Sequence, residues 1–238
     1  MQTNKKQNKK NFVRKNNAPK KFDKKNESVK APEEKKITVI IVDDQYDFSN
    51  PEGALYVPGG EKIDGPIDNY VGKNLSKVNQ IIWTRDAHKA KDKSFEVNGG
   101  TWPIHCVDGT PGAQLPDLYY KFMKMGIKSE IFNKGTDPNH EEYGAFEICV
   151  TYHHLHPNNK PQIKNCYFKN FDGTSGCRIL NDDIVICGIA GDYCVKETIK
   201  NLLKHWRFNI SVLMNGVASI DGGTALNELI EEKNLKKI

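Results

Sequence analysis

Short apolar runs recur along the chain and are separated by stretches with helical periodicity. The apolar runs lie at 37–43, 80–84, 130–132, 184–188 and 208–214, and the helical stretches at 67–78, 195–205 and 225–232. Runs rich in Ile and Val are typical of strands buried on both faces. Strands that alternate with helices predict a parallel sheet. We therefore predict an α/β fold of three αβα layers around a doubly wound, mainly parallel, Rossmann-like sheet.

Two segments depart from this pattern. Residues 1–36 contain 13 Lys and Arg against 4 Asp and Glu, with few large apolar residues. Such a segment cannot bury enough apolar surface to offset its ordering entropy. We expect a disordered basic leader over 1–36, followed by one domain over 37–238. Residues 148–169 lack periodicity, and we expect an irregular insertion there.

Composition excludes several classes of protein. The whole chain has a net charge of +5, but its positive charge is concentrated in the leader and the predicted domain is mildly acidic. We therefore do not expect nucleic acid as a partner. No apolar run reaches the length of a membrane span. Six cysteines without a secretion signal are expected to be reduced. We expect a cytoplasmic protein, with the nucleus as the alternative that a basic leader allows.

Reactive side chains follow four of the predicted strands. Asp43, Asp86, Lys134 and Cys194 each come directly or shortly after an apolar run. Because the carboxyl ends of parallel strands meet at one edge of a sheet, we expect these residues to converge. Cys194 is placed at the start of a helix, where unpaired N–H groups favour a thiolate, and we interpret it as a nucleophile. We interpret the other five cysteines as buried structural residues.

A nucleophilic thiol needs a base and a nearby positive charge. Asp43 and Lys134 fit these roles if the first, third and fourth strands lie side by side. Asp44 and Asp47, in the same VDDQYDF motif, compete with Asp43 for the role of the base.

A second group of residues has the composition of a metal site. Asp86 and His88 in TRDAH and His105 in TWPIHC form a mixed nitrogen and oxygen ligand set that suits Zn²⁺, Fe²⁺ or Mn²⁺. A rival cluster of His153, His154 and His156 lies in the predicted insertion and ranks second, because it has no acidic or cysteine partner.

These residues belong to six ordered motifs that resemble the nicotinamidase/pyrazinamidase branch of the isochorismatase-like cysteine hydrolases. The motifs are IVDDQYDF, GALYVPGGEKI, TRDAHKAKDKSF, TWPIHCVDGTPGAQL, FNKGTD…YGAF and GIAGDYCVKET. The resemblance implies a catalytic triad of Asp43, Lys134 and Cys194. It also implies an oxyanion hole formed by the backbone N–H groups of Ala190 and Cys194, with a cis peptide bond between Ile189 and Ala190.

The resemblance further implies one divalent metal ion held by Asp86, His88 and His105. Zinc is the expected ion. The implied substrate is nicotinamide, which is hydrolysed to nicotinate and ammonia for NAD salvage, with a homo-oligomer as the assembled form. Phe48, Trp102 and Tyr143 are expected to contact the pyridine ring. Two departures from the family pattern are noted: the fourth metal ligand is Asp92, Glu96 or water, and Gly191 stands where a threonine is common.

Two alternatives to a nicotinamidase remain open at this point. One is a related cysteine hydrolase that acts on another small amide or on a carbamoyl compound. The other is a catalytically silent fold that binds a partner through the basic leader. The presence of Asp43, Lys134 and Cys194 together favours an enzyme over the silent fold.

Overall fold

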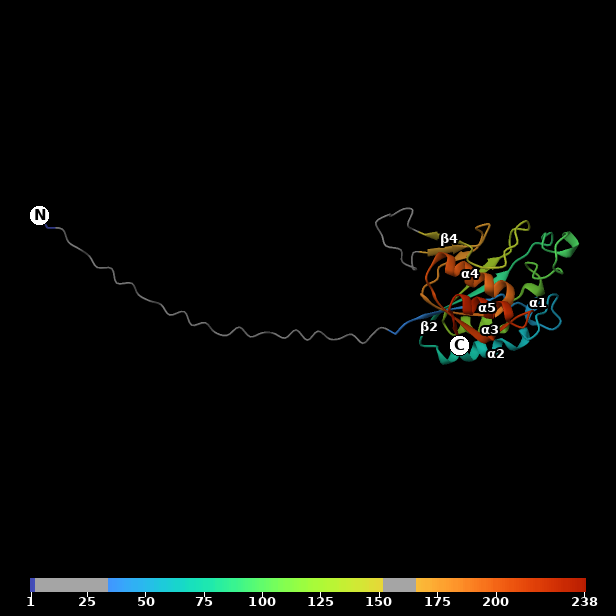
Figure 1. The fold of residues 1–238 in the computed structure, drawn as a ribbon, viewed down its shortest axis with the longest axis horizontal. Coiled ribbons are helices and arrows are strands. Elements are labelled where there is room, and N and C mark those ends of the chain that lie inside the picture. The colour runs from blue at the N-terminus through green and yellow to red at the C-terminus, as the bar shows by residue number, and fades with distance from the viewer. Residues whose placement is uncertain (3–33, 152–165) are drawn as a thin grey trace. The chain divides into compact units, whose positions relative to one another are not determined.

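The central sheet contains six parallel strands in the order β3-β2-β1-β7-β8-β9. The computed structural model describes residues 1–2, 34–151 and 166–238 (Figure 1). The strands are β1 (Ile37–Val42), β2 (Val78–Asp86), β3 (Lys128–Lys134), β7 (Asp183–Ile189), β8 (Asn209–Ala218) and β9 (Lys236–Lys237). Counted within the sheet, this is the doubly wound order 3-2-1-4-5-6. The switch point between β1 and β7 is where ligands bind in such sheets.

Helices cover both faces of this sheet, as the alternation along β1 shows. Val39 and Ile41 pack in one apolar cluster with residues of α2 (Asp64–Lys73) and α3 (Asp117–Lys124). Ile40 and Val42 pack in a second cluster with residues of α4 (Lys196–His205) and α5 (Thr224–Glu232). Successive side chains of a strand point to opposite faces, so a strand buried on both sides must be apolar throughout. The predicted three-layer αβα fold is confirmed.

A second, antiparallel sheet follows β3 along the chain. Its strands are β4 (Ile148–Thr151), β5 (Cys166–Lys169) and β6 (Gly176–Cys177), in that order. The two ends of the segment 148–169 are therefore paired strands, where the sequence analysis expected irregular structure. The rest of that segment lies outside the described residues, as does nearly all of the predicted leader.

Two further elements differ from the sequence analysis. Helix α2 ends at Lys73 rather than at 78, because the Asn74 side chain donates to the carbonyl of Tyr70 at 2.9 Å and Val78 already pairs with β1. Helix α3 was not predicted. Only Leu118 and Phe122 of α3 are buried, and the exposed Tyr120 and Met123 obscure its periodicity. A short helix, α1 (Tyr46–Ser49), follows β1.

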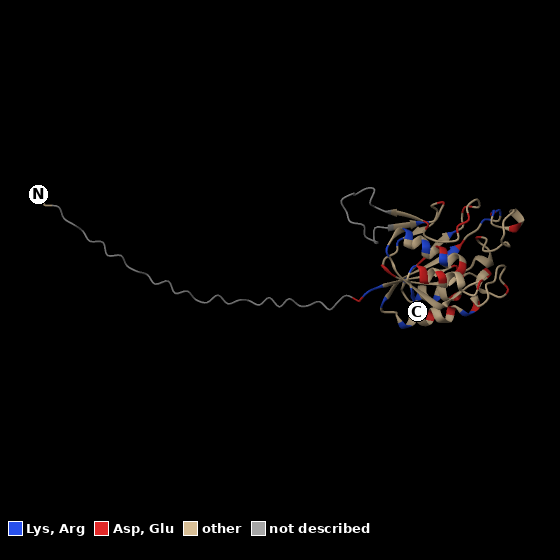
Figure 2. Cartoon of the chain, in the orientation of Figure 1, with Lys and Arg blue, Asp and Glu red and all other residues tan. Residues whose placement is uncertain are grey.

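Charged side chains are distributed unevenly between the surface and the interior. On the surface, basic and acidic residues are interspersed over the helices and loops (Figure 2). The buried charged residues of the described ranges instead lie at or beyond the carboxyl ends of the parallel strands: Asp43, Asp44, Asp47, Asp86, Asp92, Lys134, Glu142 and Asp192. Because an ionised side chain is buried only where partners compensate for lost hydration, this edge is the candidate site. No helix in the described ranges is both long and apolar enough to cross a membrane.

Candidate active site

The strand order places the site residues differently from the prediction. Strand β1 is flanked by β2 and β7, so β3 is not its neighbour. The sequence analysis required the strands before Asp43 and Lys134 to lie side by side, and that requirement is wrong. The lysine side chain is long enough to pass the end of β2 and reach Asp43, where Nζ lies 2.8 Å from Oδ2.

Lys134 is the centre of the buried cluster. Its ammonium lies 2.8 Å from Asp43 Oδ2, 2.6 Å from Asp86 Oδ1 and 3.6 Å from Cys194 Sγ, and the residue is 0% exposed. Burial would lower the pKa of the ammonium, but the carboxylates of Asp43 and Asp86 raise it well above its usual range. Lys134 therefore supplies a fixed positive charge beside the thiol.

Asp43 has the environment of a general base. Burial raises its pKa to about 6, although the Lys134 ammonium and the Thr84 hydroxyl, which donates to Oδ1 at 2.6 Å, both oppose that shift. Near neutral pH the carboxylate is ionised yet close enough to its pKa to take up a proton. Its φ of 47° places it in the left-handed region, so the chain turns sharply at the end of β1.

The two competing aspartates have other partners. Asp47 accepts the N–H groups of Ala54 at 3.1 Å and Cys106 at 2.7 Å, and so ties two loops together. Asp44 is 1% exposed, and burial together with the neighbouring Asp64 raises its pKa well above the usual range. Of the three aspartates in the motif, Asp43 is the one paired with Lys134.

Cys194 lies in a π-turn, Gly191–Val195, that leads directly into α4. The sequence analysis expected the helix start to favour a thiolate. Burial instead raises the pKa of the thiol well above its usual value, and Lys134 only partly offsets this. The resting group is a thiol that must lose its proton during the reaction.

The turn before Cys194 has the expected backbone. The peptide bond between Ile189 and Ala190 is cis, as the resemblance implied. At Gly191 an added Cβ would collide with the Ser219 hydroxyl and would lie 2.9 Å from a methyl group of Val217. Those side chains fill the space beside Gly191, so the absence of a threonine there leaves no gap in the turn.

Asp86, His88 and His105 form a group that could hold a metal ion. One ligand atom from each lies within 4.8 Å of the others, and the residues are 3–5% exposed. His88 Nδ1 lies 2.9 Å from Asp92, and His105 Nδ1 lies 2.8 Å from the carbonyl of Pro103. Because both partners can only accept, Nδ1 is the donor in each ring and Nε2 is left for a metal. Burial lowers the pKa of His88, but the carboxylates of Asp86 and Asp92 raise it to about 10, which reflects the negative charge beside this ring.

The structure separates the proposed fourth ligands. The carboxylate of Asp92 accepts from His88 Nδ1 and from the backbone N–H of Ser94, so it orients a ligand instead of joining the set. Glu96 is exposed and is not part of the group. Water remains the expected fourth ligand. The rival cluster of His153, His154 and His156 lies outside the described residues.

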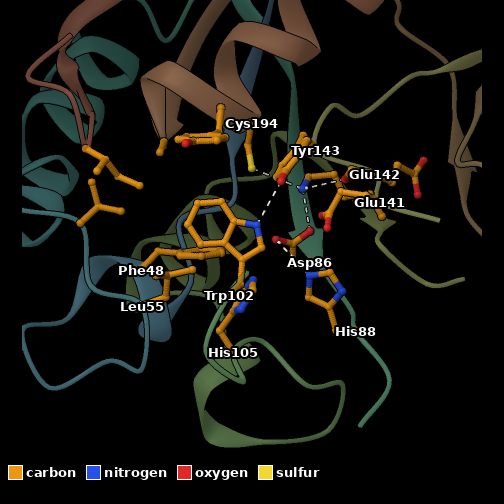
Figure 3. Close-up of a pocket in the computed structure, with 15 residues that line it drawn as sticks. Phe48, Leu55, Asp86, His88, Trp102, His105, Glu141, Glu142, Tyr143 and Cys194 are labelled. Carbon is orange, nitrogen blue, oxygen red and sulfur yellow. Dashed lines mark hydrogen bonds and ion pairs between the residues drawn. The ribbon is translucent and has the colours of Figure 1, made fainter. Parts of the chain in front are cut away.

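A pocket lined by both groups joins the thiol to these ligands. Figure 3 shows Cys194, Trp102 and Phe48 around it, with Asp86, His88 and His105 at one side. The three aromatic residues predicted to contact substrate all line this pocket. The Trp102 indole donates to the Tyr143 hydroxyl at 3.0 Å, and the ring of Phe48 lies 5.3 Å from that of His105.

Other pocket residues were not predicted from the sequence. Tyr193 lines the pocket, with its ring 5.2 Å from Trp102 and 5.6 Å from Tyr143. Its position directly before Cys194 was a usable signal, because residues beside a nucleophile lie at the pocket wall. Also missed were Leu55, Val57, Glu141, Glu142 and Ile220.

A thiol beside a carboxylate and an ammonium, at the switch point of a doubly wound sheet, is the arrangement of an α/β cysteine hydrolase. The chain is 30% identical over 186 residues to the nicotinamidase of Saccharomyces cerevisiae. The matched residues cover 68% of this chain and 78% of that protein. It is 27% identical over 199 residues to the nicotinamidase of Escherichia coli, covering 77% of this chain and 83% of that protein. No protein-family profile matches the chain.

Solved structures agree with these relatives. The pyrazinamidase of Pyrococcus horikoshii in complex with zinc matches with a TM-score of 0.62 and 32% identity, over 85% of this chain and 98% of that one. The yeast nicotinamidase matches with a TM-score of 0.64 and 27% identity, over 85% and 99%. The chain therefore belongs to the nicotinamidase family.

Proposed function

We propose that the chain hydrolyses nicotinamide to nicotinate and ammonia through a thioester on Cys194. The observation that carries this proposal is the position of the Lys134 ammonium, 2.8 Å from the Asp43 carboxylate and 3.6 Å from the Cys194 sulfur, at the base of an aromatic-walled pocket. The relatives named nicotinamidase and pyrazinamidase support the choice of substrate.

The first half-reaction forms the thioester. Asp43 takes the proton of the Cys194 thiol, and Lys134 stabilises the thiolate as it forms. The sulfur attacks the carboxamide carbon, and the negative charge that develops on oxygen is held by the backbone N–H groups of Ala190 and Cys194. Such donors contribute about 3 kcal/mol each in comparable sites. Asp43 then gives its proton to the departing nitrogen as the C–N bond breaks, which releases ammonia.

The second half-reaction removes the acyl group. Water replaces ammonia, Asp43 takes a proton from it, and the resulting hydroxide attacks the thioester carbon. The C–S bond breaks, Asp43 returns its proton to the sulfur and so restores the thiol, and the acid product loses its proton to solvent and leaves as nicotinate. The same carboxylate thus acts as base and then acid in each half-reaction, which suits a pKa of about 6.

We propose zinc as the ion bound by Asp86, His88 and His105, because two imidazole nitrogens and a carboxylate oxygen suit it. An ion there supplies an open coordination position for the pyridine nitrogen. The side chains of the protein itself orient the ring. Trp102 and Phe48 line the pocket that joins Cys194 to His105. A planar ring bound between these two aromatic side chains directs its carboxamide at Cys194.

Ammonia release from nicotinamide tests this function. Wild type is expected to release ammonia, and Cys194→Ala is expected to lose that activity by a factor of about 10⁵ or more, as for other covalent nucleophiles. Cys149→Ala, a cysteine outside the pocket, serves as the matched control and should retain activity. A chelator is expected to abolish turnover, and zinc to restore it. Release that persists in Cys194→Ala would overturn the thioester route, and no release by metal-loaded wild type would redirect the search to other small amides.

A further inference from the structure

Glu142 is a buried carboxylate for which the proposed reaction gives no role. It is 3% exposed, and neither carboxylate oxygen forms an ion pair with a side chain of the described residues. Both oxygens instead accept backbone N–H groups, Oε2 from Gly135 at 3.0 Å and Oε1 from Phe171 at 2.8 Å. A carboxylate held by main-chain donors alone is a costly arrangement inside a protein, so its position needs an explanation.

The first of these bonds fixes the main chain next to Lys134. Gly135 has a φ of +61°, and an added Cβ would lie 2.7 Å from the His88 ring. The main chain directly after Lys134 therefore packs closely against His88, one of the three residues that could hold a metal ion. The bond from Gly135 to Glu142 holds it there.

Glu142 also contacts the other end of the same lysine. Its backbone carbonyl accepts a hydrogen bond from Lys134 Nζ at 3.3 Å. Among the described residues, that carbonyl joins Asp43, Asp86 and Cys194 as a partner of the ammonium. One residue thus holds Lys134 at its backbone and at its ammonium.

The second carboxylate bond anchors this arrangement to the small sheet. Phe171 lies between β5 and β6, and its ring stacks on His140 with centroids 3.5 Å apart and planes 13° apart. The neighbouring Asn170 donates to the Thr136 hydroxyl at 2.9 Å. The loop from Gly135 to Glu142 is therefore braced from outside the central sheet.

We propose that Glu142 is a positioning residue that holds the Lys134 ammonium against Cys194 and Asp43 by closing the loop after β3. The effect on turnover rests on the proposed function, whereas the effect on the thiol does not.

Because the Glu142 carboxylate accepts both hydrogen bonds, its hold on Lys134 depends on pH. Burial raises the pKa of Glu142 to about 7, while the Phe171 and Gly135 N–H groups oppose that shift. The charged groups that face it are Lys134, which lowers the pKa, and Glu147, which raises it. Above about 7 both oxygens accept as a carboxylate, and below it one becomes a hydroxyl, which is a weaker acceptor for its backbone N–H.

The test measures alkylation of Cys194 by iodoacetamide, followed on the Cys194 peptide by mass spectrometry in the metal-loaded full chain. Glu142→Gln keeps the shape of the side chain but removes its charge. We expect this variant to slow alkylation by about ten- to hundredfold, as loss of an outer partner of an active group does. The matched control is Glu228→Gln, which neutralises an exposed carboxylate of α5 outside the pocket, and it should change the rate less than twofold. Ionisation of the thiol raises the alkylation rate with pH in both proteins. Below about pH 7 the wild-type rate should fall more steeply than this ionisation alone gives, and Glu142→Gln should lack the additional fall.

A double-mutant cycle separates positioning from a general structural role. In a Lys134→Met background, Glu142→Gln is expected to cause no further loss, because the group it positions has gone. Losses that add, or an alkylation rate in Glu142→Gln equal to wild type, would overturn the proposal. If alkylation responds as expected but wild type releases no ammonia from nicotinamide, the positioning role stands and the proposed substrate is wrong.

Discussion

Two clusters of ionisable residues share Asp86, and only one of them contains a lysine. The thiol cluster comprises Asp43, Asp86, Lys134 and Cys194, and the imidazole cluster comprises Asp86, His88 and His105. By spacing alone, both Asp43–Asp86–Cys194 and Asp86–His88–His105 could hold a metal ion. The first set already surrounds the Lys134 ammonium, at 2.8 Å from Asp43, 2.6 Å from Asp86 and 3.6 Å from Cys194. The second set has no lysine or arginine, and both of its Nε2 atoms are available.

The difference teaches how one carboxylate can serve both clusters. Oδ1 of Asp86 accepts from Lys134 at 2.6 Å, while Oδ2 lies 3.6 Å from His88 Nε2. Burial raises the pKa of Asp86, but Lys134 and His88 lower it well below its usual range, so its charge is permanent. We expect the internal ammonium to keep a metal away from the thiol, which then stays free to react.

Among the tests of the two clusters, the largest expected effect comes from removing the ammonium group of the thiol cluster. Lys134→Met should lower kcat/KM for nicotinamide by about a thousandfold or more, because the charge that stabilises the thiolate is lost. Metal bound per chain, measured by plasma emission spectrometry, should remain at one. Lys128→Met removes an exposed lysine of the same strand and should leave turnover unchanged. Loss of the metal in Lys134→Met would show that the two clusters cannot be separated.

The complementary experiment removes one histidine of the imidazole cluster. His88→Ala should lose the metal and lower kcat/KM by about a hundredfold, because a ligand is removed. The iodoacetamide reactivity of Cys194 should stay within severalfold of wild type, since Lys134 keeps its contacts. His205→Ala, which removes a histidine at the end of α4 and outside the pocket, is the control. A thiol that becomes as unreactive as in Lys134→Met would contradict independent clusters.

The pH dependence sharpens the role of the thiol cluster. Burial raises the pKa of Asp43 to about 6, so below that pH it is protonated and cannot accept the thiol proton. In Glu142→Gln, which lacks the second titrating group near 7, we expect kcat/KM to fall about tenfold per pH unit below the pKa of the base and to be independent of pH just above it. Initial rates between pH 4.5 and 8 test this. Because Lys134→Met removes the charge that holds this pKa down, the acid limb should move upward in that variant, and an unmoved limb would assign it to another group.

The smallest expected effect lies in the pocket wall. Trp102→Phe keeps an aromatic ring but removes the hydrogen bond to Tyr143, which is worth about 1 kcal/mol. We expect KM for nicotinamide to rise about fivefold with kcat within twofold. Trp206→Phe, which loses a surface bond to Asp182, is the matched control and should not change KM. A fall in kcat without a change in KM would place Trp102 in the chemistry instead of in substrate binding.

The sequence predicted the parts of the site that lie on strand ends. Asp43, Asp86 and Lys134 end or directly follow β1, β2 and β3, and the topology brings those ends together whatever the loops do. The choice between Asp43 and Asp44 could not be made from sequence, because the regular alternation of side chains stops in the turn after β1. Glu142 was missed for a related reason. Its role depends on a contact with Phe171, which lies far away in the chain.

The most direct measurement is a crystal structure of the zinc-loaded protein with diffraction recorded on both sides of the zinc absorption edge. The account predicts one anomalous peak at bonding distance, about 2.0–2.2 Å, from Asp86, His88 and His105, and none beside Cys194. The Lys134 ammonium should remain between Asp43 and the thiol. A zinc ion bonded to the Cys194 sulfur, at about 2.3 Å, would contradict the account, because the nucleophile would then be a metal ligand.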